Sequence, residues 1–295
     1  MEKKRILVFG AGVIGSLYAC LFAQAGYRVT VYARGQRLRQ LKEAGLRYEK
    51  NGKIAVSDAQ VTGTLDPDET YDFILLAVRE NQVKEALREL KAVRGDTIVT
   101  MVNTLEDYAL WESECGNGRI LPAFPGAGGR IEDGILHAKL TPRIIQPTTF
   151  AEKNGEKSSR TGELAAVFRR SGIPYQIVRD MHAWQLCQLA MVVPLADAYY
   201  MTEDPKHAGK DRRVMDKTAR QIKENMKQLT QRGVKIAPKK LILLRDLPVW
   251  ILRFALSLTY RSRFASVFMY PHSMKAPDEM RRLHGMLYRY LGKEE

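Results

Sequence analysis

The N-terminal stretch RILVFGAGVIGSLYACLFAQAGYRVTVYA, residues 5–33, decides the fold. It opens with the apolar run Arg5–Phe9, which is typical of a buried strand. The glycine-rich segment Gly10–Gly15 follows, then small and apolar residues from Ser16 to Ala25 that favour a helix, and a second strand pattern at Arg28–Ala33. A strand, a G-x-G-x-x-G loop, a helix and a second strand within about 30 residues predict a dinucleotide-binding unit.

Each glycine of this loop has a physical role. Gly10 permits the tight turn after the strand, Gly12 lets the backbone approach a pyrophosphate, and Gly15 lets the helix pack closely on the sheet. The pyrophosphate then lies at the helix N-terminus, where free N–H groups and the helix dipole favour negative charge. We therefore expect a dinucleotide to contact the whole loop, which consists of Gly10, Ala11, Gly12, Val13, Ile14 and Gly15.

The residue after the second strand discriminates between the two nicotinamide dinucleotides. NAD sites usually place Asp or Glu there to bind the ribose 2′-hydroxyl. Here Arg34 stands at that place, Arg37 and Arg39 follow, and the first acid is Glu43. A guanidinium can bind a 2′-phosphate through two hydrogen bonds, whereas a carboxylate repels it. The sequence therefore predicts NADP(H) bound by Arg34; the alternative is that these arginines only lie on the face of the following helix.

Further strand patterns follow at Phe73–Val78, Thr97–Val102, Arg119–Ala123 and Arg143–Gln146. Strands that alternate with helical or loop spacers indicate a doubly wound, mostly parallel sheet of Rossmann type. Such sheets bind ligands beyond the carboxyl ends of their strands. The residues at these ends are Arg79 and Gln82, Asn103 and Thr104, and the segment Phe124–Gly129. We expect Arg79 and Asn103 to contact the ligand.

The character of the chain changes beyond Asp180. Strand patterns end there, and long helical patterns take over at Met181–Tyr200, Lys210–Arg232, Lys239–Leu258 and Pro277–Leu291. The sequence thus predicts an α/β protein in which a Rossmann-type domain over residues 1–179 precedes a mainly α-helical domain over residues 180–295. The aromatic side chains between Phe254 and Tyr270 are expected in the core or in a subunit contact.

Composition excludes several classes of protein. The chain has 295 residues, of which 45% are hydrophobic, and this suffices for two folded domains. No apolar run reaches the ~18–20 residues that a membrane span needs. The N-terminus shows no signal-peptide pattern, which favours the cytoplasm. Three scattered cysteines argue against a disulfide framework, and no His and carboxylate set has metal-ligand spacing, so no metal is expected.

The formal net charge is +14, from 47 Lys and Arg against 33 Asp and Glu. Nucleic-acid binding is one interpretation, because clustered cations release phosphate counterions. No nucleic-acid motif accompanies the charge, so we favour a solvated basic surface with a cleft that attracts anionic ligands. The expected partners are a small carboxylate substrate and, from base rates, a second copy in a homodimer; neither nucleic acid nor membrane is expected.

These features together resemble the ketopantoate reductase family, the NADP-dependent 2-dehydropantoate 2-reductases and their relatives. The resemblance covers essentially the whole chain. Besides the glycine loop it rests on DFILLAVRENQ (Asp72–Gln82), Val102-Asn103, WQLCQLAMVVPLADA (Trp184–Ala198) and EMRRLHG (Glu279–Gly285). It implies NADPH bound by the first domain, a 2-keto acid held in the cleft between the domains, and hydride transfer to the ketone carbonyl.

The resemblance carries over unevenly to single residues. Arg79 stands where the family commonly has lysine, and Gln82 matches the glutamine that follows. Asn103 matches a family asparagine, although Thr104 replaces the next glycine. Glu279 and Ser273 match, in that order, the glutamate and the serine that meet substrate.

The family lysine that supplies the proton has no counterpart here. Aligned on Trp184 its position is that of Leu186, aligned on Pro194-Leu195 it is that of Gln185, and the segment 185–189 contains no lysine. Loss of one pre-organised donor slows such reactions by ~10²–10³-fold. A glutamine amide can hydrogen-bond a carbonyl oxygen but cannot protonate it. His182, His272 or a protonated Asp197 are other candidate donors. The alternative function is a catalytically inactive NADP(H)-binding sensor or regulatory protein on the same fold.

Overall fold

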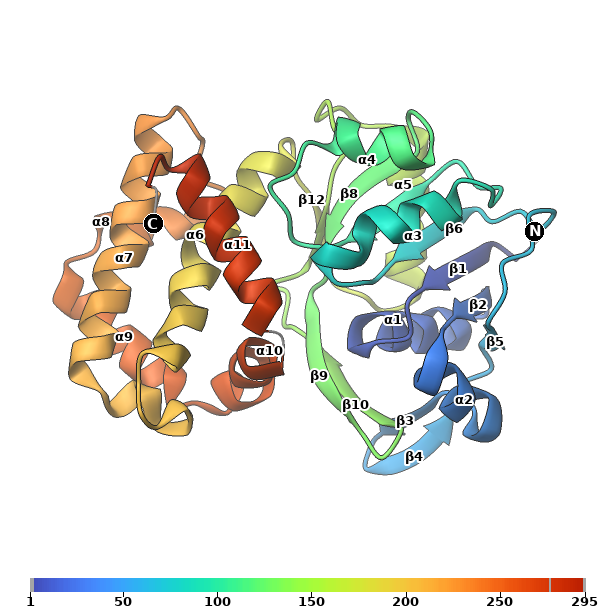
Figure 1. Ribbon diagram of the computed structural model, residues 1–295, viewed down its shortest axis with the longest axis horizontal. Helices are drawn as coiled ribbons and strands as arrows, with labels where there is room; N and C mark the ends of the chain where they lie inside the picture. Colours follow the sequence, from blue (N-terminus) through green and yellow to red (C-terminus); the bar gives the residue numbers. More distant parts are fainter. Residues whose placement is uncertain (1–2, 276, 294–295) are drawn as a thin grey trace. The chain divides into compact units, whose positions relative to one another are not determined.

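The computed structural model describes residues 3–275 and 277–293, without the side chains of His272 and Lys275. The chain divides into two compact units (Figure 1). Unit 1 comprises Met1–Val102 and Glu106–Met181, and unit 2 comprises Asn103–Leu105 and His182–Glu295. Unit 1 is α/β and unit 2 is helical, which confirms the expected fold class.

Unit 1 is built on an eight-stranded sheet with the order β12-β11-β8-β7-β6-β1-β2-β5. The pairings are parallel except that between β8 and β11. The strands are β1 (Arg5–Phe9), β2 (Arg28–Tyr32), β5 (Gln60–Thr62), β6 (Phe73–Leu76), β7 (Ile98–Met101), β8 (Ile120–Phe124), β11 (Thr148–Phe150) and β12 (Tyr175–Ile177).

Helices cover both faces of this sheet. They are α1 (Val13–Gln24), α2 (Gly35–Ala44), α3 (Val83–Leu90), α4 (Tyr108–Cys115) and α5 (Ser159–Arg170), with a 3₁₀ turn at Glu80–Gln82. Alternate residues of β1 enter opposite cores: Ile6 and Val8 pack with α1 and α5, whereas Leu7 and Phe9 pack with α3 and α4. Each such side chain contributes about 1.5–3 kcal/mol when fully buried. Burial on both faces explains why β1 reads as a continuous apolar run.

A second, four-stranded sheet with the order β4-β3-β10-β9 was not predicted from the sequence. Its strands are β3 (Arg47–Lys50), β4 (Lys53–Val56), β9 (Ala127–Glu132) and β10 (Ile135–Leu140). The β9–β10 hairpin turns at Asp133 and Gly134, which have φ of 48° and 75°, as tight hairpin turns require. The strands β3 and β4 are largely exposed, so they lack the apolar alternation that marks a half-buried strand.

The prediction of a strand at Arg143–Gln146 is wrong. This segment is a turn, in which the N–H groups of Ile145 and Gln146 both donate to the carbonyl of Pro142. Pro142 and Pro147 bracket the segment and cannot donate to a ladder, and Ile144 is 84% exposed. The strand begins after the second proline, as β11.

Unit 2 consists of helices joined by short turns. They are α6 (Met181–Tyr200), α7 (Arg212–Gln231), α8 (Ile242–Asp246), α9 (Val249–Tyr260), α10 (Tyr270–Lys275) and α11 (Pro277–Tyr290), with 3₁₀ turns at Pro205–Lys210 and Lys239–Leu241 and a π turn at Ala265–Met269. The helices α6, α7 and α11 share one core, and α7 shares a second core with α9. Pro194 lies inside α6.

The prediction of one helix over Lys239–Leu258 is also wrong. Leu247 is extended, with φ −58° and ψ 143°, and separates α8 from α9. The cause is Pro248, because the residue before a proline is disfavoured in the α conformation. Pro248 then serves as the N-cap of α9.

Candidate functional site

The glycine loop between β1 and α1 is fixed by two close backbone approaches. Gly10 has φ of 109°, and a Cβ placed on it would lie 2.4 Å from the carbonyl oxygen of Ala77. A Cβ on Gly15 would lie 1.9 Å from the carbonyl oxygen of Gly10. Both distances are far inside van der Waals contact, so neither position tolerates a side chain without movement of the backbone. The roles expected for the first and third glycines agree with this geometry.

Gly12 differs, because a Cβ on it would meet nothing within 4 Å. It is the N-cap of α1, and the first hydrogen bond within the helix runs from Ser16 N–H to its carbonyl, at 2.9 Å. The N–H groups of Val13, Ile14 and Gly15 therefore precede the helical ladder. Open space in front of a helix N-terminus fits the pyrophosphate of a dinucleotide.

The parallel register brings three strand ends to this loop. Gly10 N–H donates to Tyr32 O at 3.1 Å, and Ala77 N–H donates to Phe9 O at 2.9 Å. The carboxyl ends of β1, β2 and β6 are thus adjacent, and the connections leave β1 in opposite directions along the sheet. Such a switch point is where open α/β sheets bind ligands. Arg34 follows β2 and Arg79 follows β6 at this edge.

Arg34 is already paired with two carboxylates of α3. Its Nη1 lies 2.9 Å from Glu85 Oε1, and its Nη2 forms an ion pair with Glu89. The guanidinium also lies over the rings of Phe9 and Tyr32, at 5.6 and 5.5 Å from their centroids. Burial lowers the pKa of Arg34, but the two glutamates outweigh this effect and raise it. A phosphate at this guanidinium would compete with protein carboxylates for the same hydrogen bonds.

Arg37 supports the loop through hydrogen bonds to backbone carbonyls. Its Nε donates to the carbonyl of Ala11 at 3.1 Å, and its Nη1 donates to that of Gly134 at 3.3 Å. Arg47 donates to Asp133 O at 2.8 Å. Two arginines thereby tie the β9–β10 turn to the segment that follows β2. Arg39, the third arginine of the cluster, is exposed.

Arg79 is exposed and begins the short 3₁₀ turn before α3. The side-chain oxygen of Gln82 accepts the backbone N–H of Arg79 at 3.3 Å. Gln82 therefore shapes the backbone of this turn, and the Arg79 side chain is left at the solvent-facing edge of the sheet. This position is compatible with a contact to the dinucleotide.

Asn103 falls in the segment Asn103–Leu105, whose contacts lie with unit 2. Its side-chain oxygen is buried and has no hydrogen-bond partner among the described residues. A buried acceptor without a partner is costly, by about 1–3 kcal/mol, and often marks a place where a ligand or water donates. This observation fits the ligand contact expected for Asn103.

The other candidate catalytic residues lie on three helices of unit 2. Gln185 is on α6 and is 1% exposed. Ser273 is on α10 and is 4% exposed, and its carbonyl accepts the hydroxyl of Tyr200 at 2.5 Å. Glu279 lies in the first turn of α11 and is partly exposed. The candidate cofactor loop and the candidate catalytic side chains thus belong to different units.

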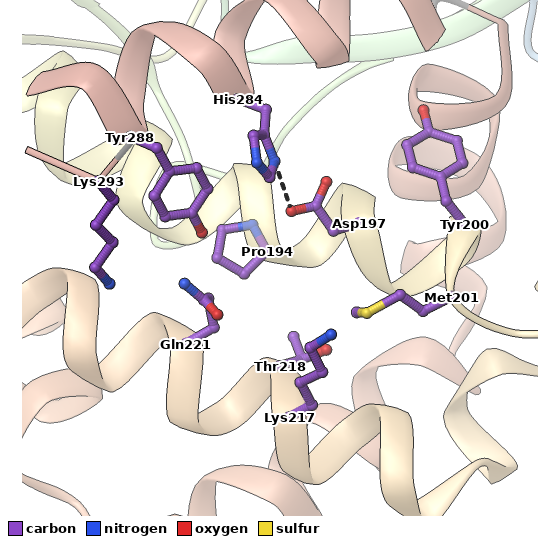
Figure 2. A pocket seen from close by; sticks show the side chains of 10 residues that line it. All are labelled: Pro194, Asp197, Tyr200, Met201, Lys217, Thr218, Gln221, His284, Tyr288 and Lys293. Atoms are coloured by element: carbon purple, nitrogen blue, oxygen red, sulfur yellow. Dashed lines mark hydrogen bonds and ion pairs between the residues drawn. The ribbon is translucent and has the colours of Figure 1, made fainter. Parts of the chain in front are cut away.

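The alternative proton donors have different environments. His182 packs edge-on against Tyr290, with ring centroids 6.4 Å apart. Asp197 forms an ion pair with His284, whose Nδ1 is 3.0 Å from Asp197 Oδ2 (Figure 2). The side chain of His272 lies outside the described part of the chain. The sequence analysis did not single out His284, Glu85 or Glu89, because their partners are 50 or more residues away and only the fold brings them together.

No group of three or more His, Cys, Asp or Glu side chains within residues 3–275 and 277–293 could hold a metal ion. Over the same ranges, no helix is long and apolar enough to cross a membrane. Cys20, Cys115 and Cys187 are buried, and none of them forms a disulfide with another described residue.

The chain is similar in sequence to 2-dehydropantoate 2-reductases. Residues 6–144 match the model of the family described as ketopantoate reductase PanE/ApbA. A 2-dehydropantoate 2-reductase of Pyrococcus horikoshii is 23% identical over 253 residues, which cover 81% of this chain and 78% of that protein. One of Archaeoglobus fulgidus is 25% identical over 183 residues, 61% of this chain but only 58% of the relative's length.

Solved structures share the fold along nearly the whole chain. The 2-dehydropantoate 2-reductase of Porphyromonas gingivalis superposes with a TM-score of 0.65 at 17% identity, covering 99% of this chain and 100% of that one. A D-mandelate dehydrogenase solved with NADH and anilino(oxo)acetate gives 0.68 at 15% identity, covering 98% and 93%. At such identities the likeness shows the fold alone.

The fold and the glycine loop define the class: a two-unit α/β protein with a Rossmann-type unit and a helical unit, which shares its fold with solved 2-dehydropantoate 2-reductases. Residues 6–144 of unit 1 thus resemble the ketopantoate reductase family, whose members use a nicotinamide cofactor.

Proposed function

We propose that the protein is an oxidoreductase that transfers hydride between NADP(H) and a 2-keto or 2-hydroxy acid. The observation that carries the proposal is the glycine loop, in which Gly10 and Gly15 have no room for a side chain while Gly12 faces open space. This combination holds a helix N-terminus open for a pyrophosphate, and the family match supplies the chemistry. The substrate is a small carboxylate other than, or in addition to, ketopantoate.

The proposed roles follow from the positions described above. The loop Gly10–Gly15 binds the pyrophosphate, Arg34 and Arg79 bind the nucleotide, and Asn103 donates to or accepts from the ligand through its buried amide. The bound nicotinamide supplies or accepts the hydride. Glu279 and Ser273 orient the substrate. Gln185 hydrogen-bonds the carbonyl oxygen, and without an ammonium there the rate is lower by ~10²–10³-fold than with one.

The choice between NADPH and NADH depends on Arg34. Its guanidinium suits a 2′-phosphate, but Glu85 and Glu89 hold it in the structure. A 2′-phosphate at Arg34 either displaces one of these carboxylates or uses the remaining N–H donors of the guanidinium beside them. NADH is the second candidate, favoured by this same observation, because Glu85 or Glu89 could accept a ribose 2′-hydroxyl as acids do in NAD sites.

An inactive NADP(H)-binding regulator is the second candidate function. It is favoured by Gln185, which is buried and cannot act as an acid. The two candidates share the cofactor site and differ only in turnover. Saturable binding of reduced cofactor without oxidation of it by any of a broad panel of 2-keto acids would favour the regulator.

The experiment is to follow the absorbance of reduced cofactor with ketopantoate and other 2-keto acids, for the natural protein and for the variants Gln185→Lys and Leu186→Lys. We expect slow turnover by the natural protein and a clear gain in kcat for one lysine variant. Fast turnover by the natural protein would overturn the role of Gln185. Failure to bind either reduced cofactor would overturn the proposal as a whole.

A homodimer stays a prediction. Large apolar side chains are exposed along one face of α9, at Trp250 (64%), Phe254 (63%) and Leu258 (52%), and this is where we expect a second copy to pack. Light scattering on the natural protein and on a Trp250→Ser variant tests it: the variant should shift the mass from dimer toward monomer.

A further inference from the structure

Unit 2 contains a pocket of about 410 Å³ that no role proposed above uses. It is open to solvent on one side and lies among α6, α7, α11 and the residues that follow α11 (Figure 2). Its volume is in the range typical of small-molecule sites. The lining residues are Pro194, Asp197, Tyr200, Met201, Lys217, Thr218, Gln221, His284, Tyr288 and Lys293.

Two lysines bring positive charge into this pocket from different elements. Lys217 comes from α7 and Lys293 follows α11, and their side chains line the pocket on the two sides of Gln221 (Figure 2). Within residues 3–275 and 277–293, neither ammonium forms an ion pair with a carboxylate. The Lys293 ammonium lies over the ring of Tyr288, 5.7 Å from its centroid, which keeps it near the pocket wall.

The single carboxylate of the lining is already engaged. Asp197 accepts from Nδ1 of His284 at 3.0 Å, and about a quarter of each side chain is exposed. This contact fixes the orientation of the imidazole and offsets part of the negative charge of Asp197. The pocket therefore carries two lysine cations against one carboxylate that already accepts a hydrogen bond, and its field favours an anion.

The rest of the lining suits the body of a small organic molecule. Pro194, Met201 and the ring of Tyr288 provide apolar contact surface, and Gln221 provides an amide that can donate or accept. The hydroxyl of Tyr200 is directed elsewhere, to the carbonyl of Ser273. Mostly apolar walls with a few charged and polar groups are typical of a binding site.

We propose that this pocket binds a small organic anion, with its carboxylate or phosphate group at Lys217, within the positive field to which Lys293 contributes, and its apolar part against Pro194 and Met201. The site is built entirely from unit 2, and it does not depend on the oxidoreductase function proposed above.

The test uses the full chain and two probes, malonate and inorganic phosphate, titrated by calorimetry at low ionic strength without nicotinamide cofactor. Lys217→Gln should weaken binding by about five- to tenfold, because a charge-assisted hydrogen bond is lost from a partly exposed site. The matched control is Lys227→Gln, since Lys227 is an exposed lysine of the same helix that does not line the pocket. The probe that binds more tightly identifies the anionic group.

A second pair of variants separates charge from folding. His284→Asn leaves Asp197 facing the anion without its partner and should weaken binding by about tenfold, whereas Asp197→Asn should leave binding equal or tighter. Rates of lysine acetylation, followed by mass spectrometry, should fall at Lys217 and Lys293 when the probe is present but not at Lys227. Equal affinity of all variants, absence of this protection, or absence of millimolar binding would each overturn the proposal.

Discussion

The glycine loop of unit 1 and the pocket of unit 2 both suit anions, but they are built in different ways. The loop uses backbone N–H groups at the start of α1, and its shape comes from glycines that are near one another in the chain. The pocket uses side chains of α6 and α11 that are 87 residues apart, such as Asp197 and His284. Its cations have no carboxylate partner in the described residues, whereas Arg34 beside the loop has two. The comparison teaches that charge is available for a ligand only where the fold has not already paired it.

The largest effect is expected for Gly15→Ala, which tests whether backbone packing builds the loop. The new Cβ would lie 1.9 Å from Gly10 O, so β1 and α1 must separate. We expect a loss of about 3 kcal/mol in the free energy of unfolding, in the upper range for overpacked sites. Urea denaturation measures it. Gly162→Ala is the control, because a Cβ there meets nothing within 4 Å and a helix gains from alanine. Equal stability of the two variants would contradict the close approach.

Gly12→Ala separates binding from stability at the same loop. Its Cβ enters open space, and the extended backbone at this N-cap suits alanine, so stability should change by less than about 1 kcal/mol. Affinity for reduced cofactor should fall about tenfold or more, because the methyl group occupies the place of the pyrophosphate. Fluorescence titration with NADPH and NADH measures it. Unchanged affinity would show that the open space is not the phosphate site.

The next effect is on the preference between NADPH and NADH, which the carboxylates around Arg34 should control. Glu85→Gln and Glu89→Gln should each raise the affinity for NADPH relative to NADH by about three- to tenfold, because the guanidinium is released and a like charge near the 2′-phosphate is removed. Arg34→Gln should change the ratio in the opposite direction. Glu114→Gln is the matched control. Glu114 forms an ion pair with Arg88 of α3 and none with Arg34, so its loss removes a similar charge without releasing Arg34. A ratio that does not move with Glu85 or Glu89 would remove Arg34 from the specificity of the site.

The smallest effect is expected for cysteine labelling, which tests whether the core behind the loop and the core of unit 2 exclude solvent equally well. Cys20 lies on α1 behind the loop, and Cys187 lies on α6 in unit 2; both are buried. Burial raises the pKa of Cys20 to about 12, against weaker opposing effects of Ser57 and Arg37, so the unreactive thiol form dominates at pH 8. We expect iodoacetamide to label neither cysteine in native protein and both in urea. Selective labelling of one in native buffer would show that its region opens.

The sequence predicted an element best where its short-range pattern and its burial agree, in both units. The loop, the strands β1, β2, β6, β7 and β8 and the helix α6 fall within two residues of expectation. Arg143–Gln146 and Lys239–Leu258 failed because apolar residues were given more weight than Pro147 and Pro248. The second sheet escaped prediction because its β3 and β4 strands are exposed.

The candidate site could be predicted only in part. The Gly10–Gly15 loop could be predicted because its glycine spacing is a local pattern, although Ala77 and Gly134, which are distant in the chain, also support it. The pairing of Arg34 with Glu85 and Glu89, and that of Asp197 with His284, depends on which elements meet in space. No spacing in the sequence encodes such meetings, so the state of charge of a site is the part that requires the structure.

Arg37 has one further consequence, for protein synthesis. The carbonyl of Ala11 at the heart of the loop is linked through Arg37 to Gly134. When the first hundred residues have emerged from the ribosome, the whole glycine motif is therefore exposed, but the β9–β10 turn that supports it has not yet emerged. A nascent chain should acquire a rigid nucleotide loop only after the β9–β10 hairpin has emerged, and a peptide cut from the N-terminal strand–loop–helix segment should be a poor mimic of the site.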